Sequence, residues 1–406
     1  MSKDKKRLVP VRRFKEFENA PAWEQRKLGD VVNRFDNLRI PVTASKRIHG
    51  EFPYYGANGI QDYVDGYTHN GEYILVAEDG ASNVYDYPVN YVKGKVWVNN
   101  HAHVIQGKTN IADNLFLLNA IKSINIASFL VGGSRAKLNA EIMMELPIKI
   151  PSYNEQKKIG KYFANIDSLI TLHQRKLDKL KRVKSAYLTE MFPAEGEREP
   201  KRRFPGFTVA WEQRKFFDNI EKVIDFRGRT PKKLGMEWSA EGYTALSALN
   251  VKDGYIDFTA DVHYANQDLY DKWMAGNELY KGQVLFTTEA PMGNVAQVPD
   301  NRKYVLSQRT IAFNVDKTKV TNDFLAVLLR SQNVQHTLKS LASGGTAQGV
   351  SQKSLSQLKV ILPINPKEQQ EIGNFFNHFD TLITLHQRKL DKLKKMKAAY
   401  LEEMFV

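Results

Sequence analysis

Two stretches of this chain are almost identical: residues 166–192 read IDSLITLHQRKLDKLKRVKSAYLTEMF, and residues 379–405 read FDTLITLHQRKLDKLKKMKAAYLEEMF. They differ at 6 of 27 positions and are offset by 213 residues. A shorter repeat precedes each of them, because Ala22–Lys27 and Ala210–Lys215 both read AWEQRK. The segments between the repeats share little visible sequence. The chain is therefore a tandem duplication with a common frame and two dissimilar middles, which we interpret as variable functional modules.

The nearly identical stretches predict two long helices. Ser152 and Glu155 form a capping box before the first, and Asn365, Pro366 and Glu368 give the second an equivalent start. Apolar residues then recur every three or four positions over about five heptads, which is typical of a coiled coil. In the first copy these positions are Ile159, Phe163, Ile166, Leu169, Ile170, His173, Leu177, Leu180, Val183, Tyr187 and Met191. About 38 residues at ~1.5 Å each give a rod of ~57 Å. Since its apolar seam needs a partner, we expect the two helices to pack against each other in antiparallel orientation.

The chain divides into six segments on these signals. They are a basic N-terminal segment at 1–20, a first module at 21–150, a central long helix at 151–192, a Gly- and Pro-containing linker at 193–208, a second module at 209–362 and a C-terminal long helix at 363–406. In the first module we expect strands at 72–77 and 95–98 and a helix at 114–130; in the second we expect strands at 283–287 and 310–313 and a helix at 322–341. The predicted fold class is α+β. Two globular modules of mixed α and β structure are joined by two long antiparallel coiled-coil helices in a pseudo-two-fold tandem repeat.

Composition and charge narrow the class of protein. Hydrophobic residues make up 42% and charged residues 26% of 406 residues, the mix of a globular protein. No apolar run reaches the length of a membrane span, and the basic start leads into no secretory signal, so we expect a cytoplasmic protein. The chain has no cysteine, which excludes disulfides, thiolate nucleophiles and cysteine-ligated metals. A net charge of +14 favours a polyanionic partner, most often nucleic acid.

The sequence shows no catalytic motif. It has neither the GxxxxGK[ST] loop of nucleotide hydrolases nor the Asn-Pro-Pro-Tyr signature of amino-methyltransferases, and no nuclease cluster of acids with a lysine. His101 and His103 could face one side of a strand as metal ligands, but a third ligand is missing, so packing or contact with DNA is the better interpretation. We therefore predict a binding protein that holds no metal and no cofactor of its own.

At this point the pattern resembles the specificity subunit of type I DNA restriction–modification systems. The resemblance rests on AWEQRK in both copies, on the helix openings Glu155–Gly160 and Glu368–Gly373, on Ser343–Thr346 and on Lys281–Phe286. It covers nearly the whole chain, and the order and repetition of these short motifs make it specific. It implies a non-catalytic subunit whose two target-recognition domains bind the halves of a bipartite, asymmetric sequence in double-stranded DNA.

The same resemblance implies partners that carry the chemistry. Two modification subunits, which bind S-adenosylmethionine, would methylate adenine N6 in each half-site, and restriction subunits would use ATP and magnesium. Leu172, Leu188, Leu385 and Leu401 lie off the expected seam and are candidates for docking the modification subunits. The basic run from Arg175 to Lys184 is either a solvated or protein-binding face or a contact with the DNA backbone.

Residues that contact DNA are predicted from residue type and position in loops, since Lys and Arg bind phosphates while Arg, Asn, Gln and His read base edges. In the first module the candidates are Arg39, Lys46, Arg47, Asn58, Asn100, His101, His103, Arg135 and Lys137. In the second they are Arg227, Arg229, Lys232, Lys233, Gln308, Arg309, Gln348 and Lys353. The Gly-rich loops 132–137 and 344–349 would let the backbone approach a phosphate, or would merely end the preceding helix.

Two other classes of function stay open. A stand-alone transcription regulator would bind DNA tightly as an isolated chain, whereas a subunit would bind weakly until its partners assemble. A structural scaffold would show little salt-dependent affinity for DNA. If the two modules are held on a rod of fixed length, changing the length of the helices or linker should change the spacer between the half-sites and not the halves themselves.

Overall fold

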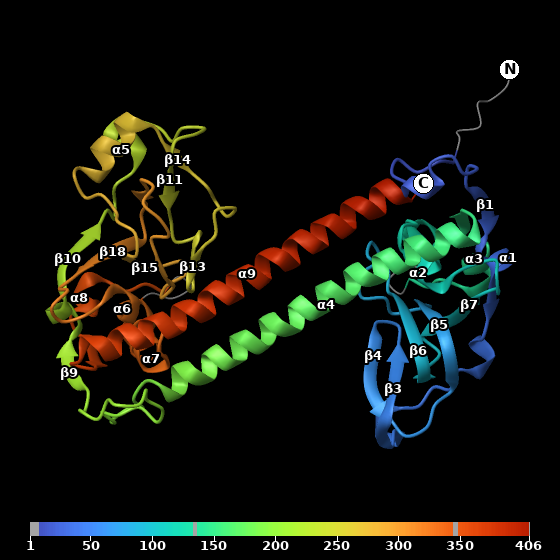
Figure 1. Cartoon of the computed structure of the whole chain (residues 1–406), viewed down its shortest axis with the longest axis horizontal. Helices are drawn as coiled ribbons and strands as arrows, with labels where there is room; N and C mark the ends of the chain where they lie inside the picture. The colour runs from blue at the N-terminus through green and yellow to red at the C-terminus, as the bar shows by residue number, and fades with distance from the viewer. Residues whose placement is uncertain (1–7, 133–135, 344–347, 406) are drawn as a thin grey trace. The chain divides into compact units, whose positions relative to one another are not determined.

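The computed structural model describes residues 8–132, 136–343 and 348–405, and the chain folds as two compact units (Figure 1). Unit 1 comprises Met1–His173 with Lys389–Val406, and unit 2 comprises Gln174–Arg388. Each unit therefore holds one module together with one end of each long helix. None of the helices in the described part of the chain is long and apolar enough to cross a membrane.

Unit 1 is built on a six-stranded sheet with strand order β2-β7-β5-β6-β3-β4. Its elements are β1 (Glu24–Lys27), α1 (Leu28–Val31), β2 (Val32–Arg34), β3 (His49–Gly56), β4 (Gly59–Val64), β5 (His69–Ala77), β6 (Val89–Val98), β7 (Ala102–Gly107), α2 (Asn114–Lys122), α3 (Ala140–Met144), β8 (Pro147–Ile150) and the first part of α4 (Tyr153–Glu190). The end of β5 is apolar and buried on both faces, as expected of a central strand. The predicted strands at 72–77 and 95–98 are confirmed within β5 and β6.

Unit 2 contains a four-stranded sheet with strand order β10-β18-β15-β16, plus three small sheets. Its elements are β9 (Glu212–Lys215), β10 (Ile220–Asp225), β11 (Tyr243–Leu246), β12 (Val251–Lys252), β13 (Tyr255–Ile256), β14 (Tyr264–Ala265), α5 (Gln267–Met274), β15 (Val284–Thr287), β16 (Val295–Gln297), β17 (Val305–Leu306), β18 (Thr310–Val315), α6 (Asn322–Leu328), α7 (Gln332–Leu341), α8 (Gln352–Leu355), β19 (Lys359–Leu362) and the first part of α9 (Pro366–Met404). Here β15 and β18 match the predicted strands.

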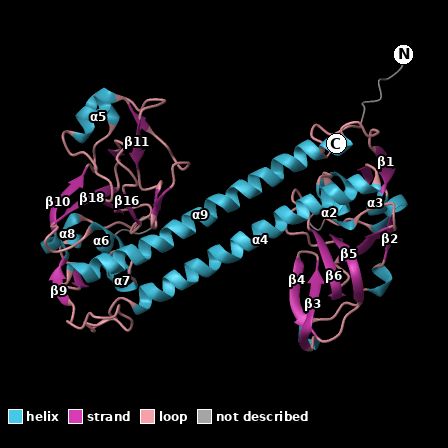
Figure 2. Cartoon of the chain, in the orientation of Figure 1, coloured by secondary structure: helices cyan, strands magenta, loops and turns pink. Residues whose placement is uncertain are grey.

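The two sheets share one plan although their sequences differ. The order β2-β7-β5-β6 in unit 1 corresponds to β10-β18-β15-β16 in unit 2, and all of these neighbours pair antiparallel. Unit 1 adds β3 and β4 at one edge (Figure 2), whereas unit 2 adds α5 and the short strands β11 to β14. The modules therefore keep a common inner sheet and differ in what surrounds it.

The AWEQRK repeats form the strand that closes each module. In the first copy β1 pairs antiparallel with β8, and in the second β9 pairs with β19. The tryptophans Trp23 and Trp211 just before these strands are buried. The strand pair brings the start and the end of each module together, beside the first turn of a long helix.

The long helices begin where the caps predict. The backbone N–H of Glu155 donates to Ser152 Oγ at 3.4 Å in α4, and the N–H of Lys367 donates to Asn365 Oδ1 at 2.9 Å in α9. Within unit 1, Asp167 pairs with Lys397 at 2.6 Å. Within unit 2, Asp380 pairs with Lys184 at 2.6 Å. Residue numbers rise along one helix as they fall along the other, so the predicted antiparallel packing is confirmed in each unit.

These two ion pairs are equivalent under the sequence repeat. Adding 213 to Asp167 gives Asp380, and subtracting 213 from Lys397 gives Lys184. The aromatic pairs Tyr162–Tyr400 and Phe375–Tyr187, with ring centroids 5.6 and 5.0 Å apart, exchange in the same way. Each unit thus repeats the same helix contacts, as expected of a duplicated chain.

Each module core is completed by the last turn of the other repeat's helix. Phe405, at the end of α9, packs against Phe116 in unit 1 with ring centroids 5.5 Å apart. Its counterpart Phe192, at the end of α4, packs against Phe324 in unit 2 at 5.9 Å. Both phenylalanines also contact the buried tryptophan of their unit. The near-identical helix ends are therefore parts of two different cores.

Two predicted helices are shorter than expected. The helix predicted at 114–130 ends at Lys122 and is followed by a separate short turn at Ile126–Phe129. The helix predicted at 322–341 is divided into α6 and α7. Serine favours helix starts over helix interiors, and Ser331, in extended conformation, is the N-cap of α7. The division leaves Arg330 next to Asp380, whose carboxylate it contacts at 2.7 Å.

The N-terminal segment and the linker contain one more repeat. Residues 10–17 read PVRRFKEF and residues 200–207 read PKRRFPGF; we name them strap 1 and strap 2. Arg13 of strap 1 holds Glu155 at the start of α4 at 2.6 Å, with both side chains buried. Arg203 of strap 2 holds Glu368 at the start of α9 at 2.5 Å.

The neighbouring arginine of each strap, Arg12 or Arg202, pairs with a glutamate at a helix end, Glu403 or Glu190. Each strap therefore ties the end of one long helix to the start of the other. The part of the linker in strap 2 is a packed element and not only a spacer.

Candidate nucleic-acid interface

Three loops meet at the same end of the inner sheet in each unit. In unit 1 they are the loop after β5 (78–88), the turn before β7 (99–101) and the described residues of the Gly-rich loop (131–132 and 136–137). The backbone N–H of Glu78 donates to His101 O at 2.9 Å, and the N–H of Leu138 donates to Glu78 O at 2.7 Å. This loop cluster brings together Asn58, Asn100, His101 and Lys137 from distant parts of the sequence.

Unit 2 repeats the arrangement with its own residues. The backbone N–H of Thr288 donates to Arg309 O at 2.8 Å, and the N–H of Val350 donates to Thr288 O at 2.9 Å. The loops are 288–294 after β15, 307–309 before β18 and the described residues of the Gly-rich loop (343 and 348–349). Since the same hydrogen bonds join the same loops, we name the two clusters loop cluster 1 and loop cluster 2.

Glu78 organises loop cluster 1. Its carboxylate accepts from Arg39 Nη1 at 2.6 Å and from Lys137 Nζ at 2.7 Å. Burial opposes ionisation of Glu78, but the hydrogen bonds from Lys137 and Arg39 are together stronger and lower its pKa. The hydrogen bond to Glu78 also raises the pKa of Lys137. The carboxylate is therefore ionised at neutral pH and holds two of the predicted DNA-contacting cations.

Asp36 holds the buried histidine of the same cluster. His103 is 1% exposed, and its ring nitrogens lie 2.7 Å from Asp36 Oδ2 and 2.8 Å from Leu138 O. Burial raises the pKa of Asp36, and the larger combined effect of the bonds from His103 and the Val104 N–H lowers it. His103 and Arg39 thus have internal partners in this structure, and contact with DNA by either of them stays a prediction.

Asp225 has the corresponding role in loop cluster 2. It accepts from the guanidinium of Arg227 at 2.5 Å and from Gln352 Nε2 at 2.7 Å. Burial opposes its ionisation, while the bonds from Arg227 and Gln352 lower its pKa. Arg229 donates to the carbonyl of Trp273, and Gln308 donates to the carbonyl of Arg229. The predicted DNA-contacting residues Arg227, Arg229 and Gln308 therefore have hydrogen-bond partners within their own module.

Other predicted residues lie on the surface of the two modules. The side chains of Lys46, Asn100, Lys232, Gln348 and Lys353 are exposed. Arg47 lies over the ring of Tyr54 with its Cζ 4.1 Å from the centroid, and Lys233 donates to the carbonyl of Gly228 at 2.7 Å. Asn58 is exposed and fastens the loop after β5, because it donates to Gly80 O at 2.9 Å and accepts from the Ser82 N–H at 2.7 Å. Arg135 lies outside the described residues.

One ion pair occupies the same position in both clusters. His101 Nδ1 lies 2.5 Å from Asp79 Oδ1, and Arg309 Nε lies 3.1 Å from Glu289 Oε1. All four side chains are at least a third exposed. The two predicted DNA contacts, His101 and Arg309, are therefore equivalent positions, each held by an acid from the neighbouring loop.

Sequence reasoning missed the acids and one aromatic residue. Asp36, Glu78 and Asp225 carry no motif, and their role follows only from the sheet that brings the loops together. Tyr85, on the loop after β5, is 90% exposed and offers a ring on which a base could stack. The repeated RRF of the straps was a visible signal, since Arg13 and Arg203 are followed by phenylalanine in both copies.

The four predicted docking leucines fall in two groups. Leu172 and Leu385 are 45% and 44% exposed on the long helices. Leu188 and Leu401 are partly buried and pack against the cores of units 2 and 1. The basic run from Arg175 to Arg182 is exposed apart from Leu177 and Leu180, which belong to the apolar stripe, whereas Lys184 is buried and paired with Asp380. Docking by any of the leucines stays a prediction.

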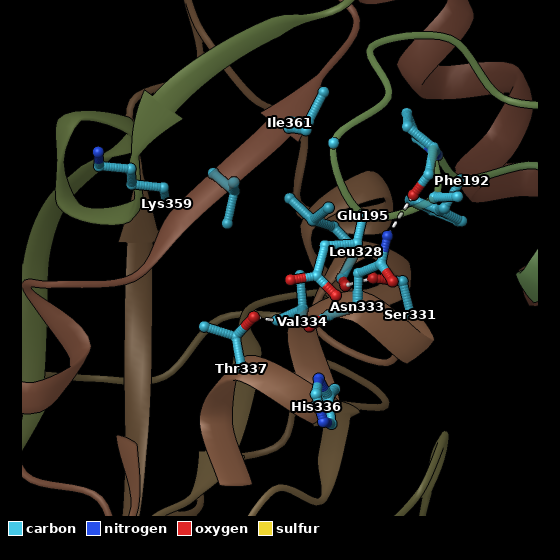
Figure 3. Close-up of a pocket in the computed structure, with 14 residues that line it drawn as sticks. Phe192, Glu195, Leu328, Ser331, Asn333, Val334, His336, Thr337, Lys359 and Ile361 are labelled. Carbon is cyan, nitrogen blue, oxygen red and sulfur yellow. Dashed lines mark hydrogen bonds between the residues drawn. The ribbon is translucent and has the colours of Figure 1, made fainter. Parts of the chain in front are cut away.

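A small open pocket lies beside the start of the linker in unit 2 (Figure 3). Its volume is about 150 Å³, and α7 and β19 form its walls together with residues 192–196. Asn333 donates to the carbonyl of Pro193 at its rim. Among the residues that the structure describes, no group of three or more His, Asp or Glu side chains could hold a metal ion, so the pocket offers no metal centre.

Comparison with known proteins shows that the chain is similar to members of one protein family. The family model described as "Type I restriction modification DNA specificity domain" matches residues 21–182 and 210–395. The chain is 30% identical over 361 residues to a putative type I restriction enzyme specificity subunit of Haemophilus influenzae, covering 88% of each chain. It is 22% identical to the MjaVIII specificity subunit of Methanocaldococcus jannaschii, covering 92% of this chain and 90% of that one.

A solved structure has the same fold. The type I restriction–modification S subunit from M. genitalium matches 98% of this chain and 99% of its own with a TM-score of 0.73. The sequence identity is 13%, so the likeness concerns the fold.

Proposed function

The chain belongs to the type I restriction–modification DNA specificity subunits, and from that premise we propose that each module reads one half of a bipartite, asymmetric DNA site. Loop cluster 1 would read one half-site and loop cluster 2 the other. The chain itself would catalyse no reaction. Its role is to decide where partner subunits act.

The observation that carries the proposal is a common sheet with different loops. Both modules present three loops at the same end of an equivalent sheet, held by the same backbone hydrogen bonds. The side chains on those loops differ, with Asn100 and His101 in one cluster and Gln308 and Arg309 in the other. A shared scaffold with different side chains is what two readers of two different sequences require, since base edges are read by side-chain donors and acceptors.

Electrostatics support a polyanionic ligand. The net charge of +14 gives the chain a general attraction for DNA phosphates. Yet Arg39, Lys137 and Arg227 are paired with acids inside the clusters. Phosphate contacts are therefore expected mainly from the exposed cations Lys46, Lys232 and Lys353, and the paired cations orient the loops.

The partners proposed for this chain carry the chemistry. Two modification subunits with S-adenosylmethionine would methylate adenine N6 in each half, and restriction subunits with ATP and magnesium would cut unmethylated DNA. Because the pairs Asp167–Lys397 and Asp380–Lys184 repeat one surface twice, two copies of a single modification subunit could dock in equivalent ways. The exposed leucines Leu172 and Leu385 are the best placed of the predicted docking residues.

The test is methylome sequencing of cells that express the chain with its modification subunit. We expect a single split motif, with methyladenine in each half and an unread spacer. Replacing residues 21–150 with the first module of another member should change one half only, and replacing 209–362 should change the other. Tight, specific binding by the isolated chain without methylation would instead favour a stand-alone regulator.

A further inference from the structure

The ion pairs Asp79–His101 and Glu289–Arg309 occupy one structural position in two modules of dissimilar sequence. His101 directly precedes β7, and Arg309 directly precedes β18. Their backbone carbonyls accept equivalent hydrogen bonds, from the N–H of Glu78 and the N–H of Thr288. Asp79 and Glu289 each directly follow those donors, and each forms a bridge with the Gly-rich loop of its module. A basic residue and an acid therefore lie side by side at the same position in two modules whose surrounding sequences differ.

The geometry of the second pair leaves a specific part of the arginine available. The shortest contact of this ion pair joins Glu289 Oε1 to Nε of Arg309 at 3.1 Å, so the carboxylate lies nearer to Nε than to the two terminal nitrogens. Within the described part of the chain, no hydrogen bond joins those two nitrogens to another residue. The Arg309 side chain is 55% exposed. A guanidinium whose Nε edge faces an acid can present its terminal nitrogens as a fork, which matches the O6 and N7 acceptors of guanine in the major groove.

The backbone at Arg309 adds an independent observation. Its φ angle is +63°, a left-handed conformation that non-glycine residues rarely adopt and that costs free energy. Such strain persists where the surrounding structure fixes it, and it is concentrated at functional positions. Here the Thr288 N–H and Oγ1 both donate to Arg309 O, at 2.8 and 3.2 Å, and hold this conformation.

A glutamate such as Glu289 is unfavourable on a surface that binds only phosphates. Glu289 is 42% exposed, and its charge would repel the DNA backbone. A carboxylate on such a loop is useful if it orients a cation toward a base. Arginine held by an acid loses less side-chain entropy when it makes a bidentate contact than a freely moving arginine does.

We propose that Arg309, held by Glu289, is a base-reading residue that recognises a guanine in the half-site of the second module, and that His101, held by Asp79, occupies the same reading position in the first. The proposal rests on the function proposed above and names the residues that carry part of it. Asp79 and Glu289 are positioning residues, since they act through the basic side chain beside them. Asp79 Oδ1 contacts Nδ1 of the His101 imidazole, so Nε2 is the ring nitrogen that would contact the edge of a single base.

The experiment uses the chain assembled with its modification subunits and measures methylation rates on a panel of duplexes with each base pair of the split site changed in turn. Arg309→Ala should remove discrimination at one base pair of one half, by about 5- to 150-fold, and leave the other half unchanged. Arg309→Lys should retain affinity but lose that discrimination, because an ammonium has no fork. His101→Ala is the matched variant and should affect only the opposite half.

Glu289 gives a second, separate readout. Glu289→Gln keeps an oxygen that can accept from Nε and should retain most of the discrimination, whereas Glu289→Ala should lose part of it. Replacing the guanine at the identified position with 7-deazaguanine removes N7, so it should slow the wild-type assembly and have little effect on Arg309→Ala. This difference is not expected of a residue that only stabilises the loop.

The outcomes separate the two levels of the argument. If the wild-type assembly methylates no split site, the proposed function fails. If it does methylate one, but Arg309→Ala slows every duplex equally and reduces the salt dependence of binding, then Arg309 contacts a phosphate and the base-reading proposal is wrong. An Arg309→Ala variant with wild-type preference at every position would also overturn it.

Discussion

The end of each long helix should stabilise the module of the opposite repeat, and two phenylalanines test this directly. Phe405 belongs to the second copy of the repeated helix but packs against Phe116, Phe163 and Trp23 in unit 1. Phe192 belongs to the first copy but packs in unit 2. Phe405→Ala should therefore destabilise unit 1, and Phe192→Ala should destabilise unit 2.

The size of the effect follows from burial. Phe192 is 5% exposed, and removing a buried phenylalanine ring costs about 3–5 kcal/mol, which includes the lost transfer energy and the cavity left behind. Phe405 is only partly buried, so its loss should lie toward the lower end of that range. Each ~1.4 kcal/mol corresponds to a tenfold change in the opening equilibrium, so the slowest amides of the affected unit should exchange about 10²- to 10³-fold faster.

Hydrogen exchange with mass spectrometry can follow the two units in one sample. Peptides covering β5 report on unit 1, and peptides covering β15 report on unit 2. Leu385→Ala removes an exposed leucine from α9 and serves as a control, with an expected effect within about 0.5 kcal/mol. If Phe405→Ala increased the exchange rate over that of the wild type more in β15 than in β5, the reasoning would be refuted. Such a result would mean that each helix end stabilises its own repeat.

Three further predictions concern the frame and the loop clusters. Arg13→Ala leaves Glu155 buried and unpaired, so it should destabilise unit 1 by about 3–5 kcal/mol in urea unfolding. Replacing both Arg13 and Glu155 with leucine should restore much of the lost stability. An equal loss in this double variant would contradict the prediction. Inserting one heptad after both Arg175 and Arg388 adds ~10.5 Å of helix, which should lengthen the methylated motif's spacer by about three base pairs and leave its halves unchanged. The pKa of Glu78 is lowered in the folded state, so its ion pairs stabilise unit 1 above the usual carboxylate pKa of about 4.3, and this stabilisation is lost as the pH falls through the lowered value. Glu78→Gln should therefore lower the melting temperature of unit 1 at neutral pH and flatten its fall in acid, and an unchanged acid limb would show that another group controls it.

The pair of long helices could be predicted from the sequence because their apolar pattern occurs in two nearly identical copies. Two copies of one apolar stripe define two helices, and their need for a partner gives the antiparallel packing. The caps at Ser152 and Asn365 fix where the helices begin. What the stripe could not show is that Phe192 and Phe405 leave the helix seam and enter module cores, since a phenylalanine at a helix end fits either role.

The loop clusters were harder to predict for a physical reason. Selection by charge and position in a loop includes His101 and Arg309, whose contact with DNA stays a prediction. It gave the same weight to Arg39 and His103, which the folded chain pairs with Glu78 and Asp36. Sequence separation hides such pairs, because the sheet brings together residues 39 to 67 positions apart. A basic residue can be recognised from the sequence, but whether an acid already holds it cannot.

The contacts of the long helices explain why the two ends of the duplication have stayed nearly identical while the middles diverged. Asp380 holds Lys184 from α4 and Arg330 from the second module, at 2.6 and 2.7 Å. In unit 1, Asp167 holds Lys397, and Lys122 interacts electrostatically with both. A substitution of Asp167 or Asp380 would therefore alter a helix seam and a module contact at once, and the other copy of the helix would have to compensate.

The loop residues are under no such double constraint. In the part of the chain that the structure describes, His101 and Arg309 each pair with an acid of their own module. His101 or Arg309 can be substituted without a change in the other, provided that the new side chain still pairs with the neighbouring acid. A chain built in this way can change one half of its proposed DNA site while the helices that every change depends on remain fixed.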